Sequence, residues 1–132
     1  MTDLTRYLED SDALVAVVGA TDSPGKYGGI IYRDLKRRGV RVAAVNPHRD
    51  TVDGDPAYAD LTSLAEEPTI VNLVVPPSEG MGVAQEAKGL GYRRVWLQPG
   101  AESAELIDYL DREEFEWLAD ACIMIRLRAV GR

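Results

Sequence analysis

The chain has 132 residues, of which 45% are hydrophobic and 28% charged, and its net charge is −7 at pH 7. This length fits one domain, and the acidic balance has the wrong sign for a surface that binds nucleic acid. The single cysteine and the single histidine, Cys122 and His48, exclude an internal disulfide and leave too few ligands for a metal cluster. No apolar run approaches the roughly 18–20 residues that cross a bilayer, so we expect a soluble, cytoplasmic protein without a membrane partner.

The first half of the chain predicts two strands with a helix between them. Residues 13–18 are apolar throughout and stop at Gly19, as expected of a buried central strand. In the following helix, Ile30, Ile31 and Leu35 are predicted to face inward, and Gly39 suits the position after the helix end. The predicted elements are a short helix at 3–9, a strand at 13–18, a helix at 28–38 and a strand at 40–46.

The second half continues this alternation after a polar loop over residues 47–60. Asp53-Gly54 suits a tight turn there, and Pro56 restricts any short strand near it to a sheet edge. The predicted elements are a helix at 62–67, a strand at 69–75, a helix at 78–90, a strand at 93–97, a helix at 101–112 and a strand at 116–119. We therefore predict an α/β, Rossmann-like, doubly wound fold. It is a single domain over residues 1–132, with a mostly parallel sheet of about five strands and helices on both faces.

Ligands of doubly wound sheets bind at the carboxyl ends of the strands, where loop amides and helix N-termini converge. The first such loop is not a Walker A loop. Five residues separate Gly19 from Gly25-Lys26, and Tyr27 stands where a magnesium-binding hydroxyl is required. It also departs from G-x-G-x-x-G, because Thr21 occupies the second glycine position. The loop is either a phosphate-binding turn that uses Thr21 or a plain strand-to-helix turn.

The second strand end carries Asn46, where NAD-binding domains normally place an acidic residue that binds the ribose hydroxyls. His48 and Arg49 follow, so a phosphorylated ribose would meet a cation there. This pattern favours a 3′-phosphate, as in coenzyme A (CoA), or a 2′-phosphate, as in NADP. An exposed loop arginine without a ligand is the plain alternative.

The sequence offers little for catalysis. Cys122 lies among apolar residues, so we expect it to be buried packing and not a nucleophile. Asp22, Glu79 and Glu102 suit the first turns of helices because the helix dipole favours acidic groups there. We therefore predict no catalytic residues and no enzymatic activity.

An ordered set of motifs runs through the chain, and most of them lie at predicted strand ends. They are Val15–Thr21, Val45-Asn46-Pro47, Tyr58-x-x-Leu61, Val74-Val75-Pro76, Val95-Trp96-Leu97-Gln98-x-Gly100 and Asp120-x-Cys122-Ile123. Together they resemble the stand-alone CoA-binding domain proteins, which are similar to the N-terminal domain of succinyl-CoA synthetase α subunits and of ADP-forming acyl-CoA synthetases. The resemblance implies a Rossmann-like fold and a CoA or acyl-CoA ligand.

The resemblance also implies where the ligand lies. The loop from Gly19 would hold the CoA phosphates, Arg49 would take the family's basic position, and the ends of the strands at 69–75 and 93–97 would line the pantetheine. The implied ligand-binding residues are Gly19, Ala20, Thr21, Asp22, Lys26, Asn46, Pro47, His48, Arg49, Val75, Pro76, Leu97, Gln98, Pro99 and Gly100. The synthetases' phosphohistidine is not carried over, because the only histidine lies in the second strand-end loop.

Three functions remain open at this point. The first is a binding module that holds CoA or an acyl-CoA without catalysis. The second is an enzyme, either NADP-dependent or a CoA-ligase subunit that works with a separate protein. The third is a nucleotide or redox sensor that reports its occupancy to a protein partner, whose identity the sequence does not give.

Overall fold

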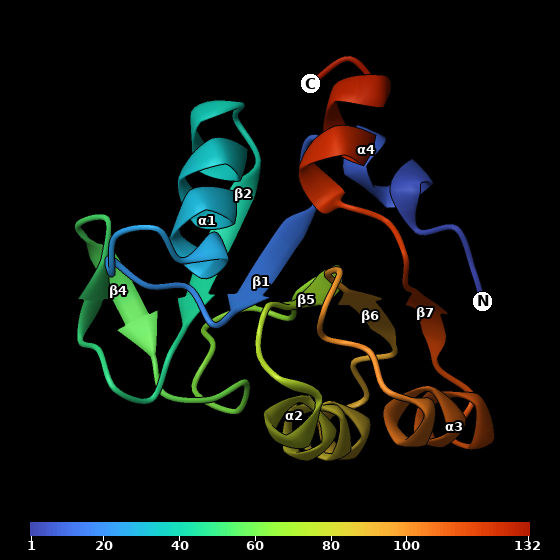
Figure 1. Ribbon diagram of the computed structural model, residues 1–132. Coiled ribbons are helices and arrows are strands. Elements are labelled where there is room, and N and C mark those ends of the chain that lie inside the picture. The colour runs from blue at the N-terminus through green and yellow to red at the C-terminus, as the bar shows by residue number, and fades with distance from the viewer.

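The computed structural model describes residues 1–132 and contains one sheet in the order β3-β4-β2-β1-β5-β6-β7 (Figure 1). Every neighbouring pair of strands is parallel except β3 and β4, which form an antiparallel hairpin. The strands are β1 (Leu14–Val18), β2 (Arg41–Val45), β3 (Thr51–Val52), β4 (Asp55–Tyr58), β5 (Ile70–Leu73), β6 (Arg94–Leu97) and β7 (Glu116–Leu118). The chain leaves β1 toward β2 on one side and returns to β5 on the other, which confirms the doubly wound α/β fold.

Helices cover both faces of the sheet. Figure 1 shows α1 and α4 on one face and α2 and α3 on the other. The helices are η1 (Thr5–Glu9, a 3-10 helix), α1 (Tyr27–Arg37), α2 (Pro77–Leu90), α3 (Ala104–Arg112) and α4 (Ile123–Ala129). The last of these, α4, was not predicted from the sequence. None of these helices is both long and apolar enough to span a membrane.

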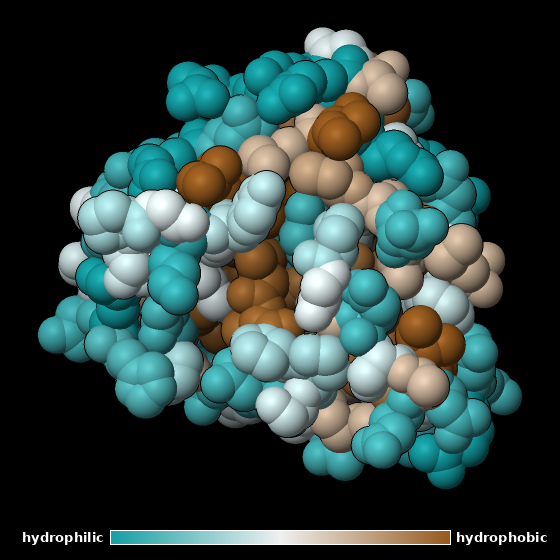
Figure 2. Space-filling model, viewed as in Figure 1, coloured by the Kyte–Doolittle hydropathy of each residue, from teal (hydrophilic) through white to brown (hydrophobic).

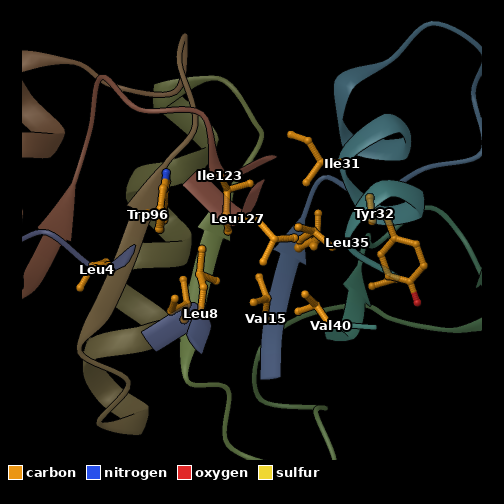
Figure 3. Close-up of a cluster of buried hydrophobic side chains, with 14 of the residues drawn as sticks. Leu4, Leu8, Val15, Ile31, Tyr32, Leu35, Val40, Trp96, Ile123 and Leu127 are labelled. Atoms are coloured by element: carbon orange, nitrogen blue, oxygen red, sulfur yellow. The ribbon is translucent and has the colours of Figure 1, made fainter. Parts of the chain in front are cut away.

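Strand β1 divides the core into two clusters, because successive side chains of a strand point to opposite faces. Val15 and Val17 pack with α1, α4 and η1, in the cluster drawn in part in Figure 3. Ala16 and Val18 pack against the face covered by α2 and α3. All five residues of β1 are buried, as predicted for the central strand.

The loop at residues 47–60 contains two strands, so the sheet has seven strands and not about five. The predicted Asp53-Gly54 turn joins them, and both residues have positive φ, 51° and 79°. This backbone is that of a tight two-residue hairpin turn. Pro56 lies in β4, one strand in from the edge, because the two-residue β3 covers β4.

Two local predictions are wrong. Residues 62–67 form turns and bends and not a helix, because the segment is short and Pro68 disfavours helical backbone at the residue before it. Glu86 accepts from the amides of residues 61 and 62, and Asp60 accepts from that of residue 63. Ile30 is 38% exposed and does not face inward, because α1 presents Ile31, Tyr32 and Leu35 to the sheet.

Candidate functional site

The carboxyl end of β1 meets the start of α1 at a distance that only glycines permit. Gly19 has φ +101°, and a Cβ built on it would lie 2.4 Å from the Val74 carbonyl oxygen. A Cβ on Gly28 would lie 1.9 Å from the Gly19 carbonyl oxygen. The first turn of α1 therefore packs directly on the strand end, and its unpaired amides lie beside the loop at residues 20–26. Gly28 was not among the predicted site residues, although a glycine pair at a helix start was a visible signal.

The Asn46 side chain ties the first two strand ends together. Its Nδ2 donates to the Ala20 carbonyl oxygen at 2.9 Å, and its Oδ1 accepts from the His48 amide at 2.9 Å. An acidic residue at this position could accept from His48 but could not donate to Ala20. Asn46 therefore fixes the geometry of both loops.

Arg49 is held over the first loop by two partners. Its Nη2 donates to Ser23 Oγ at 2.9 Å, and its Nη1 lies 3.8 Å from the Asp22 carboxylate. Thr21 shapes the same turn, because its Oγ1 accepts from the Ser23 amide at 3.1 Å. A partly exposed guanidinium thus lies beside hydroxyl groups at the mouth of the loop.

The β3–β4 hairpin is anchored to this loop and to α1. Asp22 Oδ1 accepts from the Asp53 amide at 2.8 Å, and Lys36 pairs with Asp53 and Asp55 at 3.1 and 3.0 Å. Tyr32 donates its hydroxyl to Asp55 at 2.7 Å. Burial and this hydrogen bond raise the pKa of Tyr32, and Tyr32 and then Lys36 lower the pKa of Asp55. The hairpin therefore has a fixed position beside the strand-end loops.

Tyr32 and Lys36 also form a Tyr-x-x-x-Lys pair, so our prediction that the chain has no such pair, made in excluding a reductase, is wrong. In reductases such a pair acts beside the nicotinamide ring, with the tyrosine as proton donor. Here Tyr32 and Lys36 line a separate cavity with Val42 and Pro56, and the raised pKa of Tyr32 opposes proton donation. The pair therefore stabilises the hairpin and lies apart from the strand-end loops.

Three cavities lie along the strand ends. A polar cavity of about 550 Å³ is lined by Thr21, Ser23, Asn46, His48, Arg49, Asp50 and Thr51. A valine cavity of about 440 Å³ is lined by Val18, Gly19, Val45, Asn46, Pro47, His48, Ala59, Asp60, Val75, Glu79, Val83 and Glu86. A proline cavity of about 310 Å³ is lined by Tyr27, Val74, Val75, Pro76, Pro77, Gln98, Pro99, Gly100 and Ala101.

The three cavities form one groove. Asn46 and His48 line both the polar and the valine cavity, and Val75 lines both the valine and the proline cavity. Figure 2 shows this face of the molecule, with apolar atoms at the bottom of a hollow between α1 and α2 and hydrophilic side chains around it. The groove can therefore receive an elongated ligand with both charged and apolar parts.

Eleven of the fifteen implied ligand-binding residues line the groove, and four do not. Ala20 and Leu97 are fully buried in the core. Asp22 accepts a hydrogen bond from the β3–β4 hairpin, and Lys26 is the exposed N-cap residue of α1. Helix α2 contributes lining residues that the sequence did not suggest as ligand contacts. These residues are Glu79, Val83 and Glu86. In the sequence, they could be recognised only by their spacing of three or four residues, which places them on one face of a helix that follows a strand end.

Gln98 joins the proline cavity to the start of α4. Its Oε1 accepts from the Ile123 amide at 3.2 Å, and its Nε2 donates to the Cys122 sulfur at 3.1 Å. Cys122 is half-buried, and not fully buried as predicted, because it lies outside the helix as the N-cap residue of α4. The Gln98 side chain itself is buried, so its role here is to hold α4 on the end of β6.

Comparison with known proteins supports a relation over most of the chain. The sequence is 26% identical over 111 residues to the uncharacterized protein YneT of Bacillus subtilis. This match covers 84% of this chain and 82% of YneT. It is 35% identical over 120 residues to an ADP-forming acetate–CoA ligase of Archaeoglobus fulgidus, which covers 83% of this chain. This chain spans 18% of the length of that ligase.

Solved structures show the same fold. A conserved hypothetical protein from Pyrococcus furiosus has a TM-score of 0.83 and 39% identity, covering 86% of this chain and 97% of that one. An acetyl-coenzyme A synthetase from Ca. Korarchaeum cryptofilum has a TM-score of 0.71 and 25% identity, covering 93% of this chain and 28% of that one. Residues 13–128 match the family of the CoA binding domain. The chain therefore belongs to the CoA-binding domain family, and it is homologous to the CoA-binding domain of ADP-forming acetyl-CoA synthetases.

Proposed function

We propose that this protein binds CoA or an acyl-CoA in the strand-end groove and carries out no catalysis of its own. The observation that carries this proposal is the continuity of the polar, valine and proline cavities through shared residues. CoA has matching parts, because its ribose carries a 3′-phosphate, an aromatic base and, through the pyrophosphate, the long pantetheine arm. Membership of the CoA-binding domain family supports the same ligand.

The chemistry of each cavity suits one part of the ligand. In the proposed complex the 3′-phosphate lies beside Arg49 and His48 in the polar cavity, because a guanidinium binds phosphate through charge-assisted hydrogen bonds. The pyrophosphate lies at the Gly19–Thr21 turn and the N-terminus of α1. The base fills the valine cavity, and the pantetheine arm passes Val75 into the proline cavity.

Calorimetric titration with CoA and with dephospho-CoA tests this arrangement. The wild-type protein should bind CoA about ten- to a hundredfold more tightly, because charge-assisted contacts are worth about 1.5–3 kcal/mol. Arg49→Ala should remove most of this difference, whereas Arg128→Ala, which changes an exposed arginine of α4, should keep it. Equal affinity of the wild-type protein for the two ligands would remove Arg49 and His48 from the proposed phosphate site.

The proposed lack of catalysis has its own test. Purified protein is incubated with acetyl-CoA or succinyl-CoA, with and without ATP or ADP, phosphate and NADPH, and free thiol and nucleotide are followed by chromatography. We expect no turnover above buffer, and we expect CoA to raise the melting temperature, because a ligand of the native state alone stabilises it. Turnover that scales with protein would contradict a pure binding module.

A CoA-ligase subunit is the second candidate, because the acetate–CoA ligase of Archaeoglobus fulgidus contains a homologous segment. In that case this chain would supply the CoA site and a separate protein the chemistry. Co-purification of a ligase subunit, with activity only in the mixture, would favour this function. The NADP-dependent enzyme is disfavoured by the position of Tyr32 and Lys36. The cytoplasmic location and the absence of nucleic-acid partners stay predictions.

A further inference from the structure

The valine cavity is lined by both apolar and acidic side chains. Val18, Val45, Val75 and Val83 supply the apolar side chains, from β1, β2, the end of β5 and α2. Asp60, Glu79 and Glu86 supply carboxylates from the loop after β4 and from α2. Small-molecule sites combine such apolar surfaces with a few polar groups that fix the orientation of the ligand.

Most of the polar side chains in this cavity already have partners within the protein. Asn46 uses both ends of its amide between the first two strand-end loops. Glu86 accepts from two amides and a hydroxyl, and Asp60 accepts from the amide and hydroxyl of Ser63. Glu79 and His48 line the cavity without a hydrogen bond or ion pair through their side chains, and of the two only Glu79 carries a carboxylate, which is exposed at the cavity. Its carboxylate is therefore free to accept from a ligand.

An ionised carboxylate can only accept hydrogen bonds. It therefore stabilises a base with an exocyclic amino group, such as the N6 group of adenine, which donates. A keto group at the same position, as in guanine or hypoxanthine, is itself an acceptor and would face a second acceptor. The discrimination therefore requires that the carboxylate contacts position 6 of the ring and not the neighbouring N1–H donor of the keto base. Discrimination of this kind combines a contact to the correct base with repulsion of the wrong one.

We propose that Glu79 is the specificity-determining residue of the groove, and that it selects an amino-substituted base such as adenine over its keto counterpart. The inference rests on the proposed function, which places the base in the valine cavity. The residue also lies in the first turn of α2, where an acidic side chain stabilises the helix dipole. That role affects stability, and it does not distinguish between two bases.

The experiment measures the ratio of dissociation constants for CoA and for CoA in which adenine is deaminated to hypoxanthine. We expect the wild-type protein to prefer the adenine form by roughly tenfold. Glu79→Gln should bring the ratio to within about threefold, because the glutamine amide can accept from an amino group or donate to a keto group. Glu79→Asp keeps an acceptor-only side chain and should retain a measurable preference.

Glu105→Gln is the matched control, because Glu105 lies in the first turn of α3 and outside the groove. It removes the same charge from a helix start and should leave the ratio unchanged, and thermal melts of both variants report any change in stability. Equal wild-type affinity for the two forms, or a preference that survives in Glu79→Gln, overturns the role of Glu79 while the groove remains a CoA site. If the wild-type protein does not bind CoA at all, the proposed function fails, and the inference fails with it.

Discussion

The two halves of the groove are built differently. At the ends of β1 and β2, a network of side-chain hydrogen bonds holds the loops, from Asn46 to Ala20 and from Arg49 to Ser23. At the ends of β5 and β6, the three prolines Pro76, Pro77 and Pro99 restrict the backbone through their rings. In that half, Gln98 is the residue whose side chain ties one element to another.

The difference follows from what each half is proposed to bind. Phosphates are compact and highly charged, so their donors must be held in place by other polar groups before the ligand arrives. An extended pantetheine arm needs a smooth, rigid surface, and proline supplies one without further hydrogen bonds. We therefore expect substitutions in the β1–β2 half to change affinity and those in the β5–β6 half to change mainly stability.

The largest effect is expected from Thr21→Glu in the β1–β2 half. The new carboxylate would face the pyrophosphate in the turn after Gly19, so CoA affinity should fall by more than about a hundredfold. Circular dichroism should show an intact fold, because Thr21 is half-buried in a loop. A folded variant with an unchanged dissociation constant would place the ligand elsewhere.

In the β5–β6 half, Gln98→Ala should affect stability more than affinity. The change leaves the buried Ile123 amide without its acceptor, which typically costs about 1–3 kcal/mol of unfolding free energy. Chemical denaturation measures this loss, and titration of the folded variant should show CoA affinity within about fivefold of the wild type. A large loss of affinity in a stable variant would instead make Gln98 a direct ligand contact.

A smaller effect, of opposite sign, is expected from Asp22→Asn. The Asp22 carboxylate lies 3.8 Å from Arg49 and competes with a bound phosphate, whereas asparagine keeps the oxygen that accepts from the Asp53 amide. CoA affinity should rise about two- to fivefold, as expected for a partly exposed charge. Dephospho-CoA affinity should change less. Weaker binding of both ligands would mean that Asp22 acts only by holding the hairpin.

The smallest effect is expected from Cys122→Ala. The sulfur contacts Gln98 at the start of α4 and lies outside the cavity linings, so CoA affinity should stay within about threefold of the wild type. Mass spectrometry of the purified wild-type protein tests whether Cys122 forms a disulfide with the ligand. A mixed disulfide between Cys122 and CoA would favour the redox sensor over simple binding.

Much of the fold could be predicted from local patterns in the sequence. The run at residues 13–18 is apolar at every position, as expected of a strand covered on both faces, and its residues 14–18 form β1. Gly39 and Gly91 both have positive φ after helices, as expected of helix ends. The helix predicted at residues 62–67 does not form, because Pro68 disfavours helical backbone before it, and Glu86 of α2 holds the amides of residues 61 and 62 in the observed turn.

For the groove, the sequence by itself determined which residues lie at the strand ends, because strand length and parallel order follow from apolar runs and turn residues. The tertiary structure alone decided which of them share a cavity. Ala20 and Leu97 neighbour groove residues in the sequence, yet both are buried in the core. Leu97 points into the core because side chains alternate along β6, and Ala20 packs in the cluster on the α1 face of the sheet. Glu79 and Val83 enter the groove from α2 because the helix packs across the strand ends, and packing between distant segments is not encoded in any local pattern.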